Sequence, residues 1–254
     1  MPRSITPPPR PGYAPLMTTR GIVFLDIDGT LVPSMSSSSF LASRLGHQRE
    51  LDRAEQMYAV GELTNEEVSV IDAAGWRGMN TRTVEGWLDD LPLIDGIEEV
   101  MSWCRNHRIE PALASLAWQP VSISLARRYG FTTTGGPQVG SVEFVYDGTV
   151  AQHFDEYDKR DRALALAAER QISLQQCCAI GDSRSDVPLF EALPAALALN
   201  ASPAARAAAT ASMTTQNLIA VIPWLEEWHT DSTAARTPDR VSGPATSDRP
   251  AVGQ

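Results

Sequence analysis

The fold is decided by a stretch near the N-terminus that reads Gly21-Ile22-Val23-Phe24-Leu25-Asp26-Ile27-Asp28-Gly29-Thr30. Apolar residues without alternation predict a strand that is buried on both faces, as in a parallel sheet. Two carboxylates at the end of such a strand are costly, because each loses water and each repels the other. A divalent cation beside them would make the arrangement favourable.

A second acidic cluster follows another apolar run. Residues 177–180 predict a strand, and Gly181-Asp182-Ser183-Arg184-Ser185-Asp186 comes directly after it. Two more strands are expected at 109–115 and 195–199, with helices between them, which favours a parallel α/β sheet. A cation shared by the two acidic clusters is typical of metal-assisted phosphoryl transfer.

Four elements together resemble the haloacid dehalogenase-like superfamily of phosphatases. Asp26-Ile27-Asp28-Gly29-Thr30 is similar to its D-x-D-x-T signature, and residues 181–186 are similar to its acidic G-D-x-x-x-D loop. Between them, Ser115 ends an apolar stretch and Lys159 precedes the helical stretch 160–170. The resemblance covers roughly residues 20–229 and is greatest for the phosphoserine phosphatase branch. It implies an α/β fold with a Rossmann-like parallel sheet core and a helical cap inserted after the first strand motif.

The domain organisation follows from the same patterns. Residues 33–91 interrupt the strand–helix alternation with helical periodicity, and Thr64-Asn65-Glu66-Glu67 is a capping-box signature within them. The chain is therefore expected to divide into a disordered N-terminal tail (1–19), the α/β core (20–32 and 92–229), the helical cap (33–91) and a disordered C-terminal tail (230–254). Within the core, residues 142–150 predict a β-hairpin with Asp147-Gly148 as its turn. Helices are expected at 97–107, 119–129, 160–170 and 217–228.

The resemblance implies a covalent mechanism. Asp26 would attack phosphorus, and Asp28 would serve as general acid and then general base. Mg²⁺ would bind an Asp26 oxygen, the Asp28 carbonyl and Asp182. The phosphate would be bound by Thr30, Ser115 and Lys159, with Arg160 replacing Lys159 if the register is shifted by one. Supporting roles would fall to Gly29, Gly181 and Asp186, and Thr30 is also expected to hydrogen-bond the neighbouring aspartate.

The chain departs from the phosphoserine phosphatase branch at two places. Met35 stands nine residues after the nucleophile, where that branch has a Glu for the substrate's ammonium. Leu116-Ala117-Trp118 stands where it has open glycines. Both changes favour a small phosphate ester other than phosphoserine, because a buried charge needs a partner. Arg77 and Arg82 of the cap are candidates to meet a substrate carboxylate.

Composition limits the classes of partner. The formal charge of −10 disfavours binding to nucleic acid and to anionic membranes. Three cysteines without a disulfide pattern favour a cytoplasmic, reduced protein. The sequence thus predicts a Mg²⁺-dependent phosphatase for a small-molecule phosphate ester, with its oligomeric state open. Three alternatives also stay open: phosphoserine phosphatase itself, a phosphotransferase, and a non-catalytic protein of the same fold.

Overall fold

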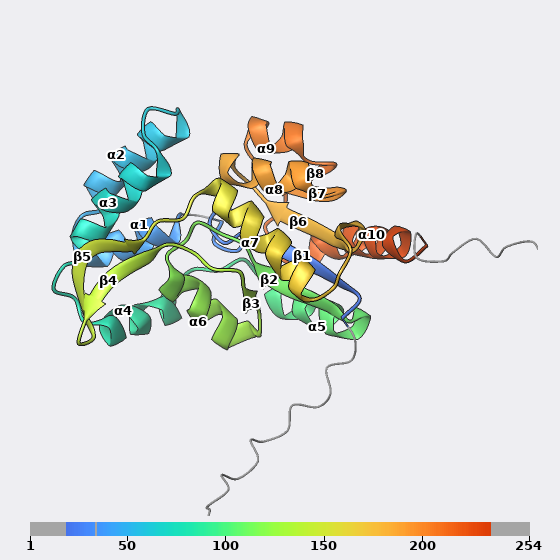
Figure 1. Ribbon diagram of the computed structural model, residues 1–254, viewed down its shortest axis with the longest axis horizontal. Coiled ribbons are helices and arrows are strands. Elements are labelled where there is room, and N and C mark those ends of the chain that lie inside the picture. The colour runs from blue at the N-terminus through green and yellow to red at the C-terminus, as the bar shows by residue number, and fades with distance from the viewer. Residues whose placement is uncertain (1–18, 34, 235–254) are drawn as a thin grey trace, which may run out of the picture.

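The computed structural model describes residues 19–33 and 35–234. Almost all of the expected N-terminal tail, and the expected C-terminal tail from residue 235 onward, lie outside these described residues. Within them, six strands form one parallel sheet in the order β3-β2-β1-β6-β7-β8 (Figure 1). The strand bounds are β1 Gly21–Leu25, β2 Ile109–Leu113, β3 Thr132–Thr133, β6 Cys177–Gly181, β7 Ala195–Leu199 and β8 Ala211–Met213. The predicted α/β fold is confirmed.

Helices cover both faces of this sheet, so its strands are buried as their apolar runs predict. One face is covered by α5 (Ile97–His107), α6 (Gln119–Tyr129) and α10 (Ile222–Ala234). The other is covered by α7 (Glu156–Glu169), α8 (Val187–Ala192) and α9 (Pro203–Ala208). Along β1, Val23 and Leu25 face the first layer, whereas Ile22 and Phe24 face the second.

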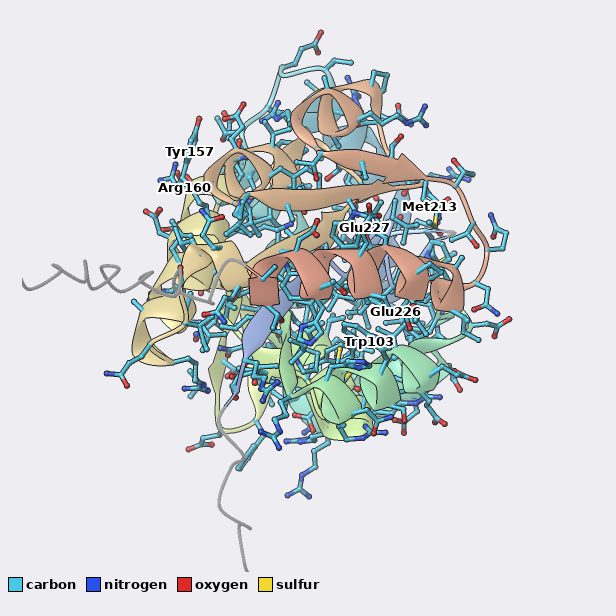
Figure 2. The ribbon with its side chains drawn as sticks, turned by 90° about the vertical axis from the view of Figure 1, so that its right-hand side faces the viewer. Trp103, Tyr157, Arg160, Met213, Glu226 and Glu227 are labelled. Carbon is cyan, nitrogen blue, oxygen red and sulfur yellow. The ribbon has the colours of Figure 1, made fainter. Side chains whose placement is uncertain are left out.

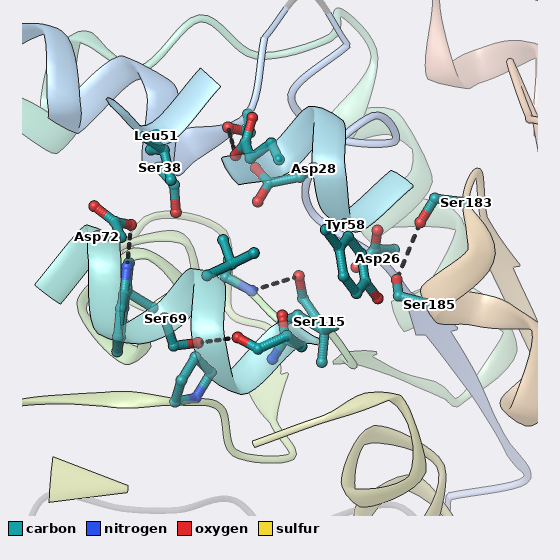
Figure 3. A pocket seen from close by; sticks show the side chains of 18 residues that line it. Asp26, Asp28, Ser38, Leu51, Tyr58, Ser69, Asp72, Ser115, Ser183 and Ser185 are labelled. Carbon is teal, nitrogen blue, oxygen red and sulfur yellow. Dashed lines mark hydrogen bonds between the residues drawn. The ribbon is translucent and has the colours of Figure 1, made fainter. Parts of the chain in front are cut away.

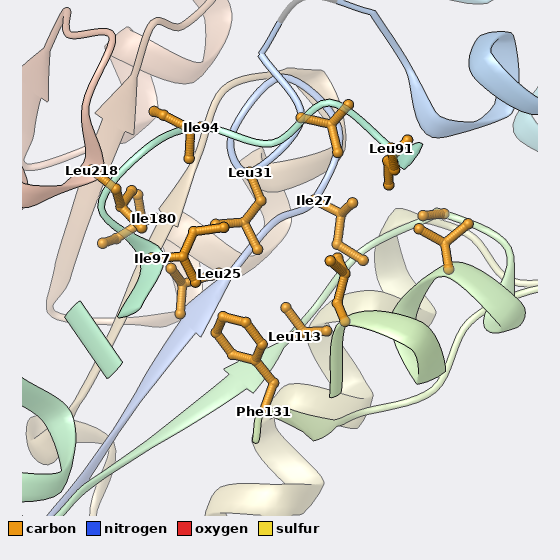
Figure 4. Close-up of a cluster of buried hydrophobic side chains, with 14 of the residues drawn as sticks. Leu25, Ile27, Leu31, Leu91, Ile94, Ile97, Leu113, Phe131, Ile180 and Leu218 are labelled. Atoms are coloured by element: carbon orange, nitrogen blue, oxygen red, sulfur yellow. The ribbon is translucent and has the colours of Figure 1, made fainter. Parts of the chain in front are cut away.

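The first layer contains the larger hydrophobic cluster. Leu25 lies there with Leu113 and Ile180 from the two strands that flank β1 (Figure 4). At the far end of this layer, Trp103 of α5 lies beneath α10, and its ring centroid is 6.1 Å from that of His229 (Figure 2). Short 3-10 helices complete the core at Leu174–Gln176, Arg184–Asp186 and Leu218–Val221.

The segment 33–91, called the insert from here on, is helical as expected. It holds α1 (Ser37–Leu45), α2 (Gln48–Ala59), α3 (Asn65–Gly75), α4 (Thr81–Trp87) and a 3-10 turn (Leu88–Asp90). The predicted capping box is present, because Thr64 accepts from the backbone of Glu67 and the Glu67 side chain accepts from the backbone of Thr64. The insert lies at the end of the molecule opposite α10 (Figure 1).

A two-stranded hairpin, β4 (Gln138–Val142) with β5 (Val145–Gln152), lies beside the insert. Gly78 N–H donates to the Tyr146 carbonyl at 2.8 Å, and Tyr146 N–H donates to the Met79 carbonyl at 2.9 Å. The hairpin is therefore part of the same surface as the insert, although Gly78 and Tyr146 lie far apart in the sequence.

The position of the hairpin turn corrects the sequence prediction. The turn consists of Glu143 and Phe144, both with positive φ, rather than Asp147-Gly148. Asp147 Oδ1 instead accepts from the backbone and the hydroxyl of Thr149, and this local turn produces a bulge inside β5. The Asp-Gly pair thus bends a strand and does not connect two strands.

Two helix boundaries also differ from the expected ones. Helix α7 begins at Glu156, four residues early, because Asp155 caps it and exchanges hydrogen bonds with Asp158. Lys159 therefore lies in the first turn of the helix and not before it. Helix α10 extends to Ala234, beyond the expected core boundary at residue 229.

In the described part of the chain, no helix has the length and apolar character needed to cross a membrane.

Candidate active site

The site is built around Asp26, the first residue after β1. Its backbone N–H donates to the Ile180 carbonyl at 2.9 Å, so the sheet fixes its position, and its side chain is buried. The ammonium of Lys159, which is fully buried, donates to Asp26 Oδ1 at 3.0 Å and to Asp186 Oδ1 at 2.6 Å. A third and longer contact joins it to the Ser185 hydroxyl at 3.4 Å. Helix α7 thus delivers a cation to the ends of β1 and β6.

The loop after β6 is held by Asp186. Its Oδ2 accepts from the backbone N–H groups of Asp182 at 2.9 Å and Ser183 at 3.0 Å. A Cβ on Gly181 would overlap the Asp186 carboxylate, and a Cβ on Gly29 would overlap the Asp182 carboxylate. Gly29 also has a φ of +80°, which disfavours a side chain. Both glycines therefore allow carboxylates to approach the backbone closely.

The electrostatics of this cluster favour a cation. One oxygen from each of Asp26, Asp182 and Asp186 lies within 4.8 Å of the others. Among the described residues, Lys159 is the one cationic side chain that forms ion pairs with this cluster, and it contacts Asp26 and Asp186. Burial raises the pKa of Asp26 to about 7 even though the Lys159 charge lowers it. Burial, and then repulsion from Asp26, raise the pKa of Asp182 to about 8. Burial lowers the pKa of Lys159, but the Asp186 and Asp26 charges outweigh burial and raise it.

The residues present fit a divalent metal ion. Three carboxylates share one ammonium, so two negative charges are in excess when all are ionised. Asp182 Oδ1 is buried and has no hydrogen-bond partner among the described residues. A set of carboxylate oxygens with an unsatisfied lone pair matches the ligand preference of Mg²⁺.

Asp28 lines the same pocket as Asp26. Its carboxylate accepts from the Ser37 backbone at 2.6 Å and from the Ser37 hydroxyl at 3.0 Å, so the N-terminus of α1 orients it. Burial raises the pKa of Asp28 to about 6, although the Ser37 hydrogen bonds lower it. Sequence reasoning missed Ser37. The signal that could have found it is Ser36, which caps α1 by accepting from Ser39 N–H and so makes Ser37 the first residue of the helix.

A cavity of about 210 Å³ opens onto these groups. Asp26, Asp28 and Ser115 line it from the core, where the Ser115 hydroxyl accepts from Ala117 N–H at 3.1 Å. Residues of α2 and α3 line the opposite side, and Figure 3 shows Tyr58, Ser69 and Asp72 facing the same space. Sequence reasoning also missed this lining, which consists of Leu51, Glu55, Tyr58, Asn65, Val68, Ser69 and Asp72.

Several expected positions lie elsewhere. The Thr30 hydroxyl is buried without a partner among the described residues, so its expected bond to an aspartate is absent. Met35 is 42% exposed and does not line the cavity. Arg160 lies within α7 but does not line the cavity, and its Nε donates to Asp161 Oδ1 at 2.7 Å, so the alternative register is wrong (Figure 2).

Arg77 and Arg82 of the insert also point away from the cavity. Arg82 lies over the Phe144 ring at 5.8 Å, and the Arg77 side chain lies against Gly148 of the hairpin. Neither guanidinium is placed to meet a substrate carboxylate, which corrects that expectation.

Curated relatives were found among phosphoserine phosphatases. Phosphoserine phosphatase SerB2 of Mycobacterium tuberculosis is 23% identical over 202 residues, which are 79% of this chain and 49% of that protein. The chain therefore spans about half the length of SerB2. Phosphoserine phosphatase of Lactococcus lactis subsp. lactis is 22% identical over 215 residues, covering 83% of this chain and 98% of that protein.

Solved structures share the fold. A phospho-aspartyl intermediate analogue of phosphoserine phosphatase has a TM-score of 0.73 at 18% identity and covers 81% of this chain and 99% of its own. A substrate-bound phosphoserine phosphatase complex has a TM-score of 0.74 at 17% identity and covers 81% and 98%. A family model described as haloacid dehalogenase-like hydrolase matches residues 23–191, well over half of the sequence. The chain thus belongs to the haloacid dehalogenase-like hydrolases and, by its relatives, resembles their phosphoserine phosphatases.

Proposed function

We propose that the protein is a Mg²⁺-dependent phosphatase that hydrolyses a small phosphate monoester through a phosphorylated Asp26. One observation carries this proposal. A buried carboxylate at the end of β1 lies between an ammonium and a metal-type acidic cluster, and it opens onto a small cavity that also holds Asp28. A protein that only bound metal would not need Asp28 on the cavity wall.

The reaction has two halves. In the first, an Asp26 oxygen attacks phosphorus, an O–P bond forms and the ester O–P bond breaks. Asp28 gives its proton to the departing alkoxide oxygen. In the second half, a water molecule gives a proton to Asp28 and its oxygen attacks phosphorus, so a new O–P bond forms and the Asp26 O–P bond breaks, which releases inorganic phosphate and restores the Asp26 carboxylate. The raised pKa of Asp28, about 6, suits a group that must both give and take a proton.

The surrounding groups would balance charge on the phosphoryl oxygens. Lys159 can exchange its longest contact, the 3.4 Å bond to Ser185, for a phosphoryl oxygen, and the Ser115 hydroxyl can donate from the cavity wall. The residues that would hold Mg²⁺ are Asp26, Asp182 and the Asp28 carbonyl, with Asp186 orienting the loop. When bound, Mg²⁺ supplies positive charge beside the phosphoryl group. Thr30 and Gly29 complete the loop next to the phosphate position.

The insert would act as the lid of this site. We assign residues 20–32 and 92–229 to the catalytic core and residues 33–91 to the lid, since α2 and α3 form the cavity wall opposite Asp26. A lid over a small cavity excludes water and limits the substrate to a small, soluble ester. Cys104, Cys177 and Cys178 are free and buried, which suits a reducing compartment such as the cytoplasm.

The test is phosphate release from p-nitrophenyl phosphate and from a panel of small phosphate esters, with Mg²⁺ and after chelation. Asp26→Asn keeps the side-chain volume but removes the nucleophile, so it should retain less than about 1% of wild-type turnover. Asp89→Asn, an exposed carboxylate of the insert, is the matched control and should be fully active. Turnover of Asp26→Asn near the wild-type rate, or full activity in chelator, would overturn the proposal.

A further inference from the structure

The cavity wall formed by the insert is acidic. Glu55 of α2 and Asp72 of α3 line it together with Asp26 and Asp28 of the core. Among the described residues that line the cavity, none is Lys, Arg or His. The ammonium of Lys159 lies behind Asp26, fully buried and bonded to two carboxylates. The end of the cavity away from the phosphate position therefore carries negative charge that the cavity lining leaves unbalanced.

Glu55 is the group best placed to meet a ligand there. Its Oε1 accepts from the Ser36 hydroxyl at 2.7 Å, which orients the carboxylate and leaves Oε2 for another donor. Asp72 is already occupied, because its Oδ1 accepts from Trp76 Nε1 at 3.2 Å and contacts His47 Nε2 at 2.7 Å, and its Oδ2 accepts from Trp118 Nε1 at 2.6 Å.

The charges around Glu55 also favour a cation. The Tyr58 ring, one turn along α2 from Glu55, is already covered by the Arg184 guanidinium, whose carbon lies 4.3 Å from the ring centroid. Burial, followed by the nearby Asp72 and Asp52 charges, raises the pKa of Glu55 despite its bond to Ser36. A cation bound to Glu55 Oε2 would relieve this repulsion, whereas a neutral hydroxyl would only donate a hydrogen bond.

A carboxylate on the substrate would find no cationic side chain among the described residues that line this cavity. Arg77 and Arg82, the candidate partners in the sequence, lie against the hairpin. A substrate carboxylate would instead share the cavity with Glu55, Asp28 and Asp72. Like charges in one small cavity repel each other, which weakens binding.

We propose, building on the phosphatase function above, that the substrate's alcohol part carries an ammonium and no carboxylate, and that Glu55 binds this ammonium. The substrate class is the phosphate monoester of a small amino alcohol. This revises the argument from Met35: the ammonium partner is present but comes from α2. Discrimination against phosphoserine would therefore arise from its carboxylate and not from its ammonium.

Three esters with the same two-carbon body separate these charges. O-phosphoethanolamine has the ammonium, 2-hydroxyethyl phosphate replaces it with a hydroxyl, and O-phosphoserine adds a carboxylate. We expect kcat/KM of the full chain with Mg²⁺ to be about tenfold or more higher for phosphoethanolamine than for either other ester. Glu55→Gln should lower kcat/KM for phosphoethanolamine about tenfold, mostly through KM, and should change kcat/KM for 2-hydroxyethyl phosphate much less.

Glu50→Gln is the matched control, because it removes the same charge from an exposed position of the same helix. It should leave all three values within about twofold, as expected for a solvated charge. A wild-type preference for 2-hydroxyethyl phosphate or phosphoserine, or an equal loss on all three esters in Glu55→Gln, would overturn the substrate inference and leave the phosphatase function standing. Hydrolysis of p-nitrophenyl phosphate without any of phosphoethanolamine would also overturn it. Absence of hydrolysis of every ester would instead overturn the proposed function.

Discussion

Lys159 places one buried charge between two carboxylates, and this position makes it both a structural and a chemical group. Its ammonium lies 3.0 Å from Asp26 and 2.6 Å from Asp186, and none of these three side chains is more than 4% exposed. Removing one member of such a set leaves the others buried and uncompensated, which is more costly than never having formed the set.

We therefore expect Lys159→Met to lower the free energy of unfolding by about 3–5 kcal/mol and to abolish turnover. Arg160→Met tests the neighbouring cation, whose partner Asp161 is solvent-exposed, and should change stability by no more than about 1 kcal/mol. Urea unfolding of both variants in chelator measures the difference. Equal destabilisation by the two substitutions would show that the Lys159 contacts are not the cause.

The sequence was sufficient to place the carboxylates of the core but not the lining from the insert. Asp26, Asp28, Asp182 and Asp186 follow buried strands, so their meeting at one edge of a parallel sheet was predictable. Glu55 lies in the middle of an amphipathic helix, where a charge is usually solvated. Only the docking of α2 over the core turns it toward the cavity, and no local pattern records that docking.

At the scale of elements, Asp72 connects the insert to the core. Its two oxygens accept from Trp76, the C-cap residue of α3, and from Trp118, the N-cap residue of α6. The rings of Trp76 and Trp118 also meet edge to face, with centroids 5.9 Å apart. Both tryptophans bury an indole N–H on the same carboxylate, but only Trp118 belongs to the core.

This difference predicts that two similar variants will differ in how mobile the insert becomes. Trp118→Phe removes a lid-to-core bond, so it should speed amide hydrogen exchange across α3 and raise KM for the preferred ester. Trp76→Phe removes a bond at the C-terminus of α3. Both variants should lower the free energy of unfolding by about 1–3 kcal/mol, the range for one buried hydrogen bond, but Trp76→Phe should not selectively loosen the insert. Equal exchange in α3 of the two variants would show that Asp72 does not hold the lid against the core.

Element prediction failed where side chains changed the local backbone or where strands were very short. Asp147-Gly148 has the composition of a hairpin turn, but Thr149 supplies the hydrogen bonds that make it a bulge. Strands β3 and β8 have only two and three residues, too few for a periodic pattern. Helix α7 begins at Glu156 and not at the predicted residue 160, because Asp155 caps it within a charged run that has no apolar periodicity.

For the whole molecule, the acidic cluster links stability to pH and to metal. The folded-state pKa values of Asp26, about 7, and Asp182, about 8, exceed the ordinary value of 3.8. Between pH 4 and 8 these two groups therefore hold more protons in the folded metal-free protein than in the unfolded chain. These two groups should therefore lower the free energy of unfolding as pH rises through this window, because their carboxylates lose protons more easily in the unfolded chain, where water solvates the charge.

We accordingly expect the Tm of the protein in chelator to fall by roughly 5 °C or more between pH 6 and pH 8. Mg²⁺ should remove most of this fall, because a cation bound only to the folded state replaces the protons and adds binding energy. Asp182→Asn deletes one of the titrating groups and the carboxylate with the unpartnered oxygen. Its Tm in chelator should vary less with pH, and Mg²⁺ should raise its Tm little. Calorimetric or fluorescence melts over pH 6–8, with and without Mg²⁺, measure all four cases. A Tm of the wild type that rises with pH in chelator, or an equal response of both proteins to Mg²⁺, would mean that this cluster is not where charge and metal act on the fold.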